Sequence, residues 1–241
     1  GYGGTFARMG LQVVAQAILA RALGPAEFGV FAAFMLLIAA SALASDLVCA
    51  PLLHAPDLND GILGFACAVQ WTGALVVSLL SLTTLPLFQR SFPATDGLGL
   101  SLCLVAFGIF VSGWSGVALS LLRRKLRYRE IQLAQLIGYF VGYVLVAMPL
   151  VLMGLKSHHV LVLAWLGQAV VSAGLQYHWE RHALRARWAY PGSRQFLRYG
   201  GVVCLGNLAN WFTSSIDRLL VARHAAPAHI GYYLTMLNLM L

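Results

Sequence analysis

Five long windows of this chain contain no Asp, Glu, Lys or Arg, and they constrain the fold more than any other feature. The windows cover residues 61–89, 98–122, 131–155, 157–179 and 199–216. An apolar stretch of about 18 residues or more is long enough to cross the hydrocarbon core of a bilayer as a helix. None of the windows alternates polar and apolar residues with period two, as a strand of an outer-membrane barrel would. The windows therefore predict an all-α, polytopic transmembrane helix bundle.

The composition supports a membrane protein. Only 10% of the residues are charged and 60% are hydrophobic, whereas a typical soluble domain carries about 25% charged residues. Eight acidic and sixteen basic side chains are too few to cover a soluble protein of 241 residues.

The apolar pattern predicts eight helices. Their expected limits are 5–23, 28–50, 62–88, 98–122, 131–153, 159–179, 196–217 and 230–241. We expect three parts: a first six-helix bundle over 1–180, a basic cytoplasmic or interfacial linker over 181–195, and the start of a second bundle over 196–241. Because the chain begins without Met and ends inside an apolar run, we expect it to be an N-terminal fragment of a longer protein.

Basic residues are distributed unevenly among the loops, which predicts an orientation. The loops after the fourth and sixth helices hold ten Lys and Arg residues, and those after the first, third and fifth hold three. Cytoplasmic loops carry the excess of positive charge in membrane proteins. We therefore expect a cytoplasmic N-terminus in a multi-pass inner-membrane protein. Anionic lipid headgroups attract such segments, so no nucleic-acid partner is expected.

A short pattern occurs twice, at the junction of the first two helices and again near the end of the chain. Residues 19–31 read LARALGPAEFGVF and residues 221–233 read VARHAAPAHIGYY. The residues singled out in this junction motif are Arg21, Gly24, Pro25, Gly29, Arg223, Pro227 and Gly231. Recurrence after six helices preserves orientation, which is typical of transporters built from two parallel halves.

The first junction also has a local explanation. Gly24 can end the first helix in a left-handed conformation, and Pro25 cannot continue that helix. Glu27 then lies in the first turn of the second helix, where a negative charge suits the helix dipole. A plain tight hairpin explains each copy of the motif but not their shared pattern.

Polar residues form stripes along two predicted helices. The stripe residues are Arg8, Gln12 and Gln16 on the first helix, and Asn207, Asn210, Ser214 and Asp217 on the seventh. The second helix contributes Asp46. Because polar groups in hydrocarbon are costly, these side chains are expected to line a central wet cavity. Snorkelling of Arg8 and Asp217, an interfacial Asp46, and plain helix contacts of the two Asn residues are the alternatives.

Small residues form further stripes, Gly108, Ser112, Gly116 and Ser120 on the fourth helix and Gly138 and Gly142 on the fifth. They permit close helix packing, and we expect no chemistry from them. His158 and His159 are expected in a solvated loop. HWERH at 178–182 lacks the Glu directly after its first His that a zinc protease needs, and no phosphate-binding Gly-rich loop occurs. We expect no enzyme activity, no metal and no cofactor.

Three segments together resemble one family. These are ARALGPAEFGVFA, ALSLLRRKLRYREIQLAQLIGYFVG and SRQFLRYGGVVCLGNLANWFTSSIDRLLVARHAAPAHIGYY. They resemble the bacterial O-antigen and exopolysaccharide flippases of the multidrug/oligosaccharidyl-lipid/polysaccharide superfamily. The second junction departs from the pattern, with Ala226 and His229 where the first has Gly24 and Glu27.

The resemblance implies two six-helix bundles around a central cavity, with the chain covering the first bundle, the seventh helix and the start of the eighth. It implies the flipping of an undecaprenyl-pyrophosphate-linked oligosaccharide across the bacterial inner membrane by alternating access. Arg8 and Arg218 would suit phosphate oxygens, and Asp46 or Asp217 could bind a coupling proton or cation. Other expected partners are membrane lipids and further polysaccharide assembly proteins. A drug/cation antiporter and a membrane-embedded glycan polymerase or ligase are the alternatives.

Overall fold

The computed structural model describes residues 2–91, 97–155 and 157–224, and no strand occurs among them. The helices are α1 (Tyr2–Leu23), α2 (Pro25–His54), α3 (Asp60–Leu82), α4 (Leu85–Ser91), α5 (Leu98–Trp114), α6 (Gly116–Arg124), α7 (Tyr128–Tyr139), a π-helical segment (Phe140–Ala147), α8 (Met148–Leu152), α9 (His158–Trp179) and α10 (Ser193–His224). The predicted all-α bundle is therefore confirmed. The helix expected at 230–241 lies outside the described residues.

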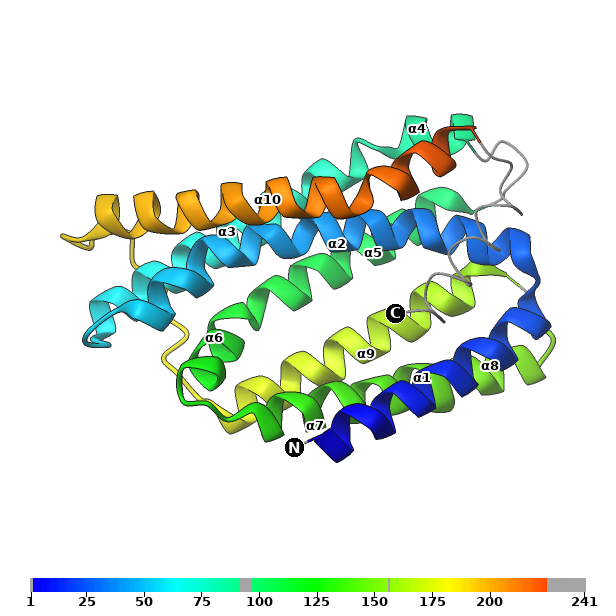
Figure 1. The fold of residues 1–241 in the computed structure, drawn as a ribbon, viewed down its shortest axis with the longest axis horizontal. Coiled ribbons are helices and arrows are strands. Elements are labelled where there is room, and N and C mark those ends of the chain that lie inside the picture. The colour runs from blue at the N-terminus through cyan, green and yellow to red at the C-terminus, as the bar shows by residue number, and fades with distance from the viewer. Residues whose placement is uncertain (1, 92–96, 156, 225–241) are drawn as a thin grey trace.

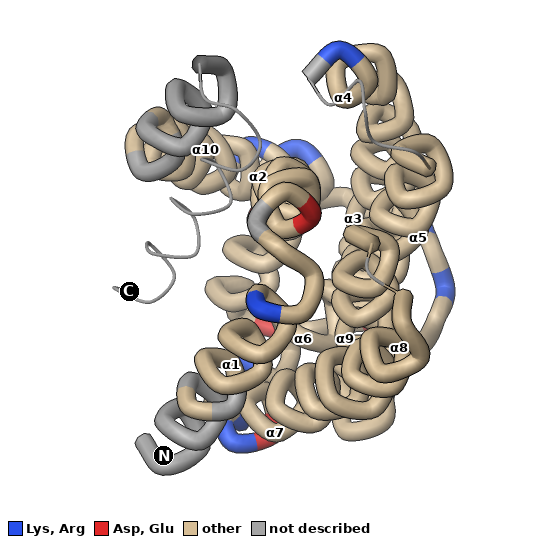
Figure 2. The backbone as a smooth tube through the Cα atoms, turned by 90° about the vertical axis from the view of Figure 1, so that its right-hand side faces the viewer, with Lys and Arg blue, Asp and Glu red and all other residues tan. Residues whose placement is uncertain are grey.

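Among the described residues, four continuous stretches are long and apolar enough to cross a membrane, namely Asp60–Arg90, Leu98–Arg124, Tyr128–Leu152 and His158–Trp179. They correspond to the third to sixth predicted helices. Shorter apolar stretches lie in α1 and α2, at Gln12–Leu23 and Ala26–Ala39. Charged residues are few along the backbone tube in Figure 2. The chain is a membrane protein with a polytopic helical bundle.

Two of the predicted helices are interrupted, and hydroxyl groups lie at both interruptions. Between α3 and α4, the hydroxyls of Thr83 and Thr84 donate to the carbonyls of Leu80 and Ser81 at 2.7 and 2.6 Å. Between α5 and α6, the Ser115 hydroxyl donates to the Ser112 carbonyl at 3.0 Å. Such bonds offer the backbone carbonyl an alternative partner and often bend helices.

The predicted helix at 131–153 contains the π-helical segment Phe140–Ala147 between α7 and α8. Pro149 follows this segment directly. Proline has no backbone N–H, so the α-helical bond from residue 149 to the carbonyl of Leu145 cannot form. The wider π-helical turn lies just before this missing bond.

The α2 helix is the common wall of the bundle. It contacts α3, α5, α6 and α9 on one side, and α10 runs along it on the outside (Figure 1). Close approach of α10 depends on Gly200, because a Cβ there would overlap the backbone carbonyl of Leu47. One apolar core cluster joins α1, α2, α5, α9 and the π-helical segment, and a second joins α2, α3, α6 and α10.

The junction between α1 and α2 follows the predicted motif with one difference. Gly24 separates the helices with a φ of 85°, as expected for glycine, but its ψ of 163° places it outside the left-handed helical region. Pro25 begins α2, and Gly29 is buried. The repeated junction cannot be compared, since Pro227 and Gly231 lie outside the described residues and so does the side chain of Arg223.

Glu27 also fastens this junction to α9. Its Oε2 atom accepts hydrogen bonds from the backbone N–H of His158 at 2.6 Å and from the Nδ1 of that residue at 2.9 Å. His158 is only 1% exposed, and the Nδ1 of His159 lies 2.7 Å from the Ser101 hydroxyl. The prediction that His158 and His159 lie in a solvated loop is therefore wrong, because the N-terminus of α9 packs against α2.

The small-residue stripes pack helices closely, as predicted. A Cβ on Gly108 would overlap the Trp165 ring, and one on Gly138 would overlap the Ser172 side chain. At Gly142 the overlap would be with the backbone carbonyl of Ala164, which cannot move out of the way as a side-chain tip can.

We expect Gly142→Ala to destabilise the bundle by about 1–3 kcal/mol, since overpacking forces backbone shifts. Thermal unfolding in detergent, followed by size-exclusion chromatography, would measure the loss. Gly174→Ala is the matched control, because Gly174 lies on α9 where an added methyl group would meet no neighbouring atom within 4 Å. Equal melting temperatures for the two variants would contradict close packing at the Gly142 contact with α9.

We expect Glu27→Ala to cost about 1–3 kcal/mol, because a buried donor of His158 would lose its acceptor. The same unfolding measurement applies. Glu27→Gln retains an acceptor oxygen and should lose less. Arg21→Ala, an exposed neighbour in the same junction, should be close to neutral. A neutral Glu27→Ala would show that this contact does not stabilise the fold.

Candidate functional site

An inner cavity of about 350 Å³ lies among α2, α3, α5, α6 and α9. Ile38, Ile109 and Trp165 form part of its apolar wall. Its polar and charged lining residues are Ser41, Ser45, Asp46, Gln70, Ser112, Ser120 and Arg123. Such a concentration of polar groups among apolar helices is costly in a membrane, which makes this cavity the candidate functional site.

Gln70 of α3 contributes a deeply buried amide to this cavity, with 3% of its surface exposed. Its Nε2 donates to the Ser45 hydroxyl at 2.9 Å. Its Oε1 is buried and accepts no hydrogen bond from the described residues. A buried acceptor without a partner is uncommon in proteins. The cavity therefore offers an acceptor to a ligand hydroxyl, a cation or water.

Two glycines on the facing helices α5 and α6 leave space for the Gln70 amide. A Cβ on Gly116 would lie 2.6 Å from the Gln70 Nε2, and one on Gly113 would overlap the Ala74 side chain. The glycines thus let α3 approach the α5–α6 break. The Ser120 hydroxyl is occupied, since it donates to the Gly116 carbonyl at 2.7 Å.

Two residues of opposite charge belong to the lining. The Nη1 of Arg123 donates to the Cys49 sulfur at 3.5 Å, which is a weak acceptor. In the described part of the chain, the Arg123 guanidinium takes part in no ion pair. The Asp46 Oδ2 accepts from the Asn207 amide of α10 at 2.9 Å. The cavity can therefore present a cationic donor at α6 and an anionic acceptor at α2.

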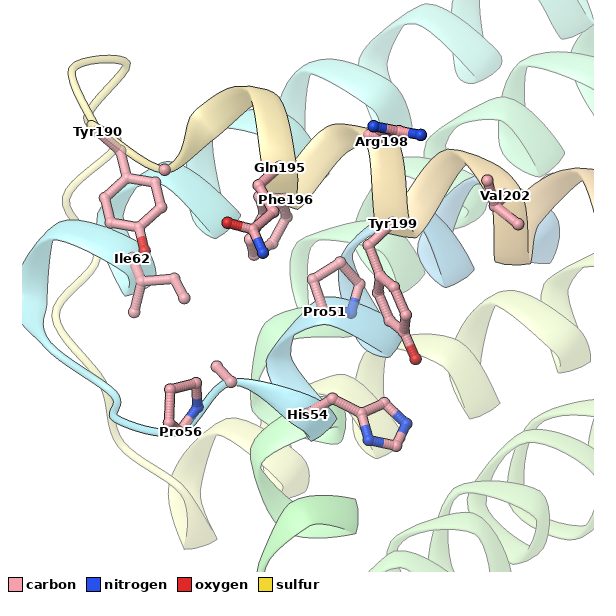
Figure 3. Close-up of a pocket in the computed structure, with 12 residues that line it drawn as sticks. Pro51, His54, Pro56, Ile62, Tyr190, Gln195, Phe196, Arg198, Tyr199 and Val202 are labelled. Atoms are coloured by element: carbon pink, nitrogen blue, oxygen red, sulfur yellow. The ribbon is translucent and has the colours of Figure 1, made fainter.

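A second hollow, which we call the groove, lies between the end of α2 and the start of α10 (Figure 3). Its volume is about 710 Å³. His54 and Tyr199 meet edge-on across it, with ring centroids 5.7 Å apart. Phe65 packs against Tyr190 and Phe196 at 5.8 and 5.4 Å. The groove therefore has aromatic walls at one end of the bundle.

Basic residues surround this end of the bundle. Arg124 donates to the carbonyls of Leu52 and Ala55 at 2.7 and 2.6 Å, and so completes the C-terminus of α2. Glu180 is nearly buried and pairs with both Lys125 and Arg127. These contacts bring the two basic loops, predicted to be cytoplasmic, to the same end. Burial lowers the pKa of His182, so this imidazole adds no charge there at neutral pH.

A sequence profile described as polysaccharide biosynthesis protein matches residues 18–241. The chain belongs to this family. No curated protein and no solved structure matches it. The predicted family resemblance is thus confirmed at the level of polysaccharide biosynthesis.

In this polysaccharide biosynthesis protein, the helices that carry the two predicted polar stripes pack against different helices, α1 against α7 and α10 against α2. α1 packs along α7, where the Gln12 carbonyl accepts from the Tyr139 hydroxyl at 3.4 Å. Gln16 is half-buried. Asn207 and Asn210 are exposed on α10, and only Asn207 contacts a predicted partner, Asp46. The side chains of Arg8, Ser214, Asp217 and Arg218 lie outside the described residues.

Sequence reasoning missed Gln70 and Arg123 as cavity residues. Gln70 is isolated in an apolar window. Arg123 belongs to a predicted loop whose positive charge was attributed to its cytoplasmic location. The stripe of Ser112, Gly116 and Ser120 was interpreted as packing alone, although all three line the cavity. A single amide within a long apolar window, such as Gln70, is the sequence signal that could have indicated the cavity lining.

We expect the cavity to admit water. In a variant without native cysteines, Ser112→Cys should react with a charged, membrane-impermeant thiol reagent added to open membranes, because Ser112 lines the cavity. Phe107→Cys is the control, since Phe107 is 54% exposed on the same helix but does not line the cavity and would face lipid. Equal labelling of both positions would contradict a wet cavity.

Proposed function

We propose that this polysaccharide biosynthesis protein takes part in transport rather than catalysis. In this proposal it moves a polyprenyl-pyrophosphate-linked oligosaccharide from the inner to the outer leaflet of the bacterial inner membrane by alternating access. Such a role covers the O-antigen or exopolysaccharide classes of substrate. The single observation that carries the proposal is the inner cavity, where four serines, the Gln70 amide, Asp46 and Arg123 line a hollow among apolar helices.

The lining of this cavity suits a phosphorylated glycan. Sugar hydroxyls both donate and accept hydrogen bonds, and the free Gln70 Oε1 requires a donor. The spare N–H groups of Arg123 match phosphate oxygens, which arginine binds through paired hydrogen bonds. A volume of about 350 Å³ suits part of an oligosaccharide.

The bond between Asp46 and Asn207 provides a physical basis for coupling the halves. It joins α2, in the predicted first bundle, to α10, the predicted start of the second. Binding of a proton or cation to Asp46 would weaken its acceptor strength and so alter this contact. Asp217 is a second candidate for that role on the sequence alone. Other polysaccharide assembly proteins would supply and remove the substrate.

The alternatives fit this cavity less well. A drug/cation antiporter would favour an acidic, more apolar pocket, whereas this lining combines Asp46 with Arg123, Gln70 and four serines. A membrane-embedded glycan polymerase or ligase would act on the same lipid-linked glycan. It differs from a flippase in the intermediate that accumulates when it fails.

The test is complementation of cells that lack the corresponding gene. We expect Gln70→Ala and Arg123→Gln to reduce surface polysaccharide about ten-fold or more, since the first removes a buried amide and the second removes the cationic donor of the lining, each worth about 1–3 kcal/mol. Asp46→Asn tests the coupling role. Arg129→Gln, a change on α7 outside the cavity lining, is the control, and membrane abundance must be equal in all strains.

The accumulating intermediate separates the candidates. Loss of flipping leaves lipid-linked oligosaccharide in the cytoplasmic leaflet, whereas loss of polymerisation leaves single repeat units on the cell surface. Full surface polysaccharide in both the Gln70→Ala and Arg123→Gln strains would remove the inner cavity from the mechanism. Surface single repeat units would instead favour the polymerase alternative.

A further inference from the structure

The groove between α2 and α10 is separate from the inner cavity and has a different chemistry. In the part of the chain that the structure describes, no residue lines both hollows. Its walls are mainly apolar or aromatic, with Pro51, Ile62, Phe196 and Val202 among them. Figure 3 shows Tyr199 directed toward His54 and Gln195 directed into the space below α10. The groove is thus lined mainly by apolar side chains, with a few polar groups among them.

The position of the groove matches the boundary between lipid tails and headgroups. It lies where α2 ends and α10 begins, beside the 180–192 segment. Trp188 and Tyr199 near it are 61% and 43% exposed, and such amphipathic rings are enriched at membrane interfaces. The loops at this end carry ten basic residues, in 123–129 and 181–198, against the four acidic residues Asp57, Asp60, Glu130 and Glu180. An anionic headgroup is therefore attracted to this end.

We propose that the groove binds one anionic glycerophospholipid of the membrane, with its phosphodiester at Arg198 and a portion of an acyl chain along Val202. Twelve residues line the groove, all of them described, and Arg198 is the one with a permanent charge. The neutral hydrogen-bonding groups nearby are Gln195 and the hydroxyls of Tyr190 and Tyr199.

The charge of the groove suits this ligand. The one guanidinium of the lining matches the single negative charge of a phosphodiester, which arginine binds through paired hydrogen bonds. The apolar remainder of the lining suits hydrocarbon and not a hydroxyl-rich glycan. Bound lipid at this place would hold α10 against α2, beside the Asp46–Asn207 contact.

The experiment is native mass spectrometry of the full chain extracted with phosphatidylglycerol and phosphatidylcholine at equal concentration. We expect the wild type to retain phosphatidylglycerol preferentially. Arg198→Gln should lower that retention about five-fold, the effect of one basic side chain near an anionic surface. Arg198→Lys should keep most of it. Val202→Trp should also lower it by filling the apolar end, and Val202 is 66% exposed, so the larger ring can be accommodated.

Arg129→Gln is the matched control, because it removes the same charge from the same end without touching the groove. Circular dichroism and size exclusion would confirm that each variant folds. Equal retention of the two lipids, or equal losses in Arg129→Gln and Arg198→Gln, would overturn the proposal. Displacement of phosphatidylglycerol by a lower concentration of polyprenyl pyrophosphate would also overturn it, and would assign the groove to the transported lipid.

Discussion

A polar atom inside a bilayer must find its hydrogen-bond partner within the protein, and most features of this bundle follow from that constraint. The hydroxyls of Thr83, Thr84 and Ser115 donate to carbonyls of the preceding turn at the helix breaks. Arg124 donates a hydrogen bond to a carbonyl at the end of α2, and the Glu27 carboxylate accepts one from the first backbone N–H of α9. The Oε1 of Gln70 accepts no hydrogen bond from the described residues and belongs to the lining of the inner cavity, where a ligand or water can reach it.

The α2 helix connects the two hollows. Its residues that line the inner cavity are Ile38, Ser41, Ala42, Ser45, Asp46 and Cys49, and near its end Pro51 and His54 line the groove. α10 lies along both parts, with Gly200 allowing contact at the groove and Asn207 bonded to Asp46 at the cavity. A movement of α10 relative to α2 would therefore affect both sites. This shared wall is the physical reason to connect lipid occupancy of the groove with the state of the cavity.

Some elements could be predicted from local sequence and others could not. The positive φ of Gly24 could be expected from a glycine directly before the proline that begins the next helix. The close helix contacts at Gly108 and Gly142 could be expected from small residues spaced along one helix face. His158 illustrates the limit, because two adjacent histidines after a charged residue are typical of a loop. Their burial depends on Glu27, 131 residues away, and no local pattern encodes that contact. The membership of Gln70 and Arg123 in one cavity is likewise a product of helix packing.

The sequence by itself determined that the chain forms apolar helices, approximately where those of the described part lie, and which family it belongs to. It did so because hydrocarbon thickness and the cost of unpaired backbone groups leave few alternatives to a helix. Only the tertiary structure decided which polar side chains share a chamber. Helix contacts depend on the rotation and spacing of each helix, which small residues permit but do not specify.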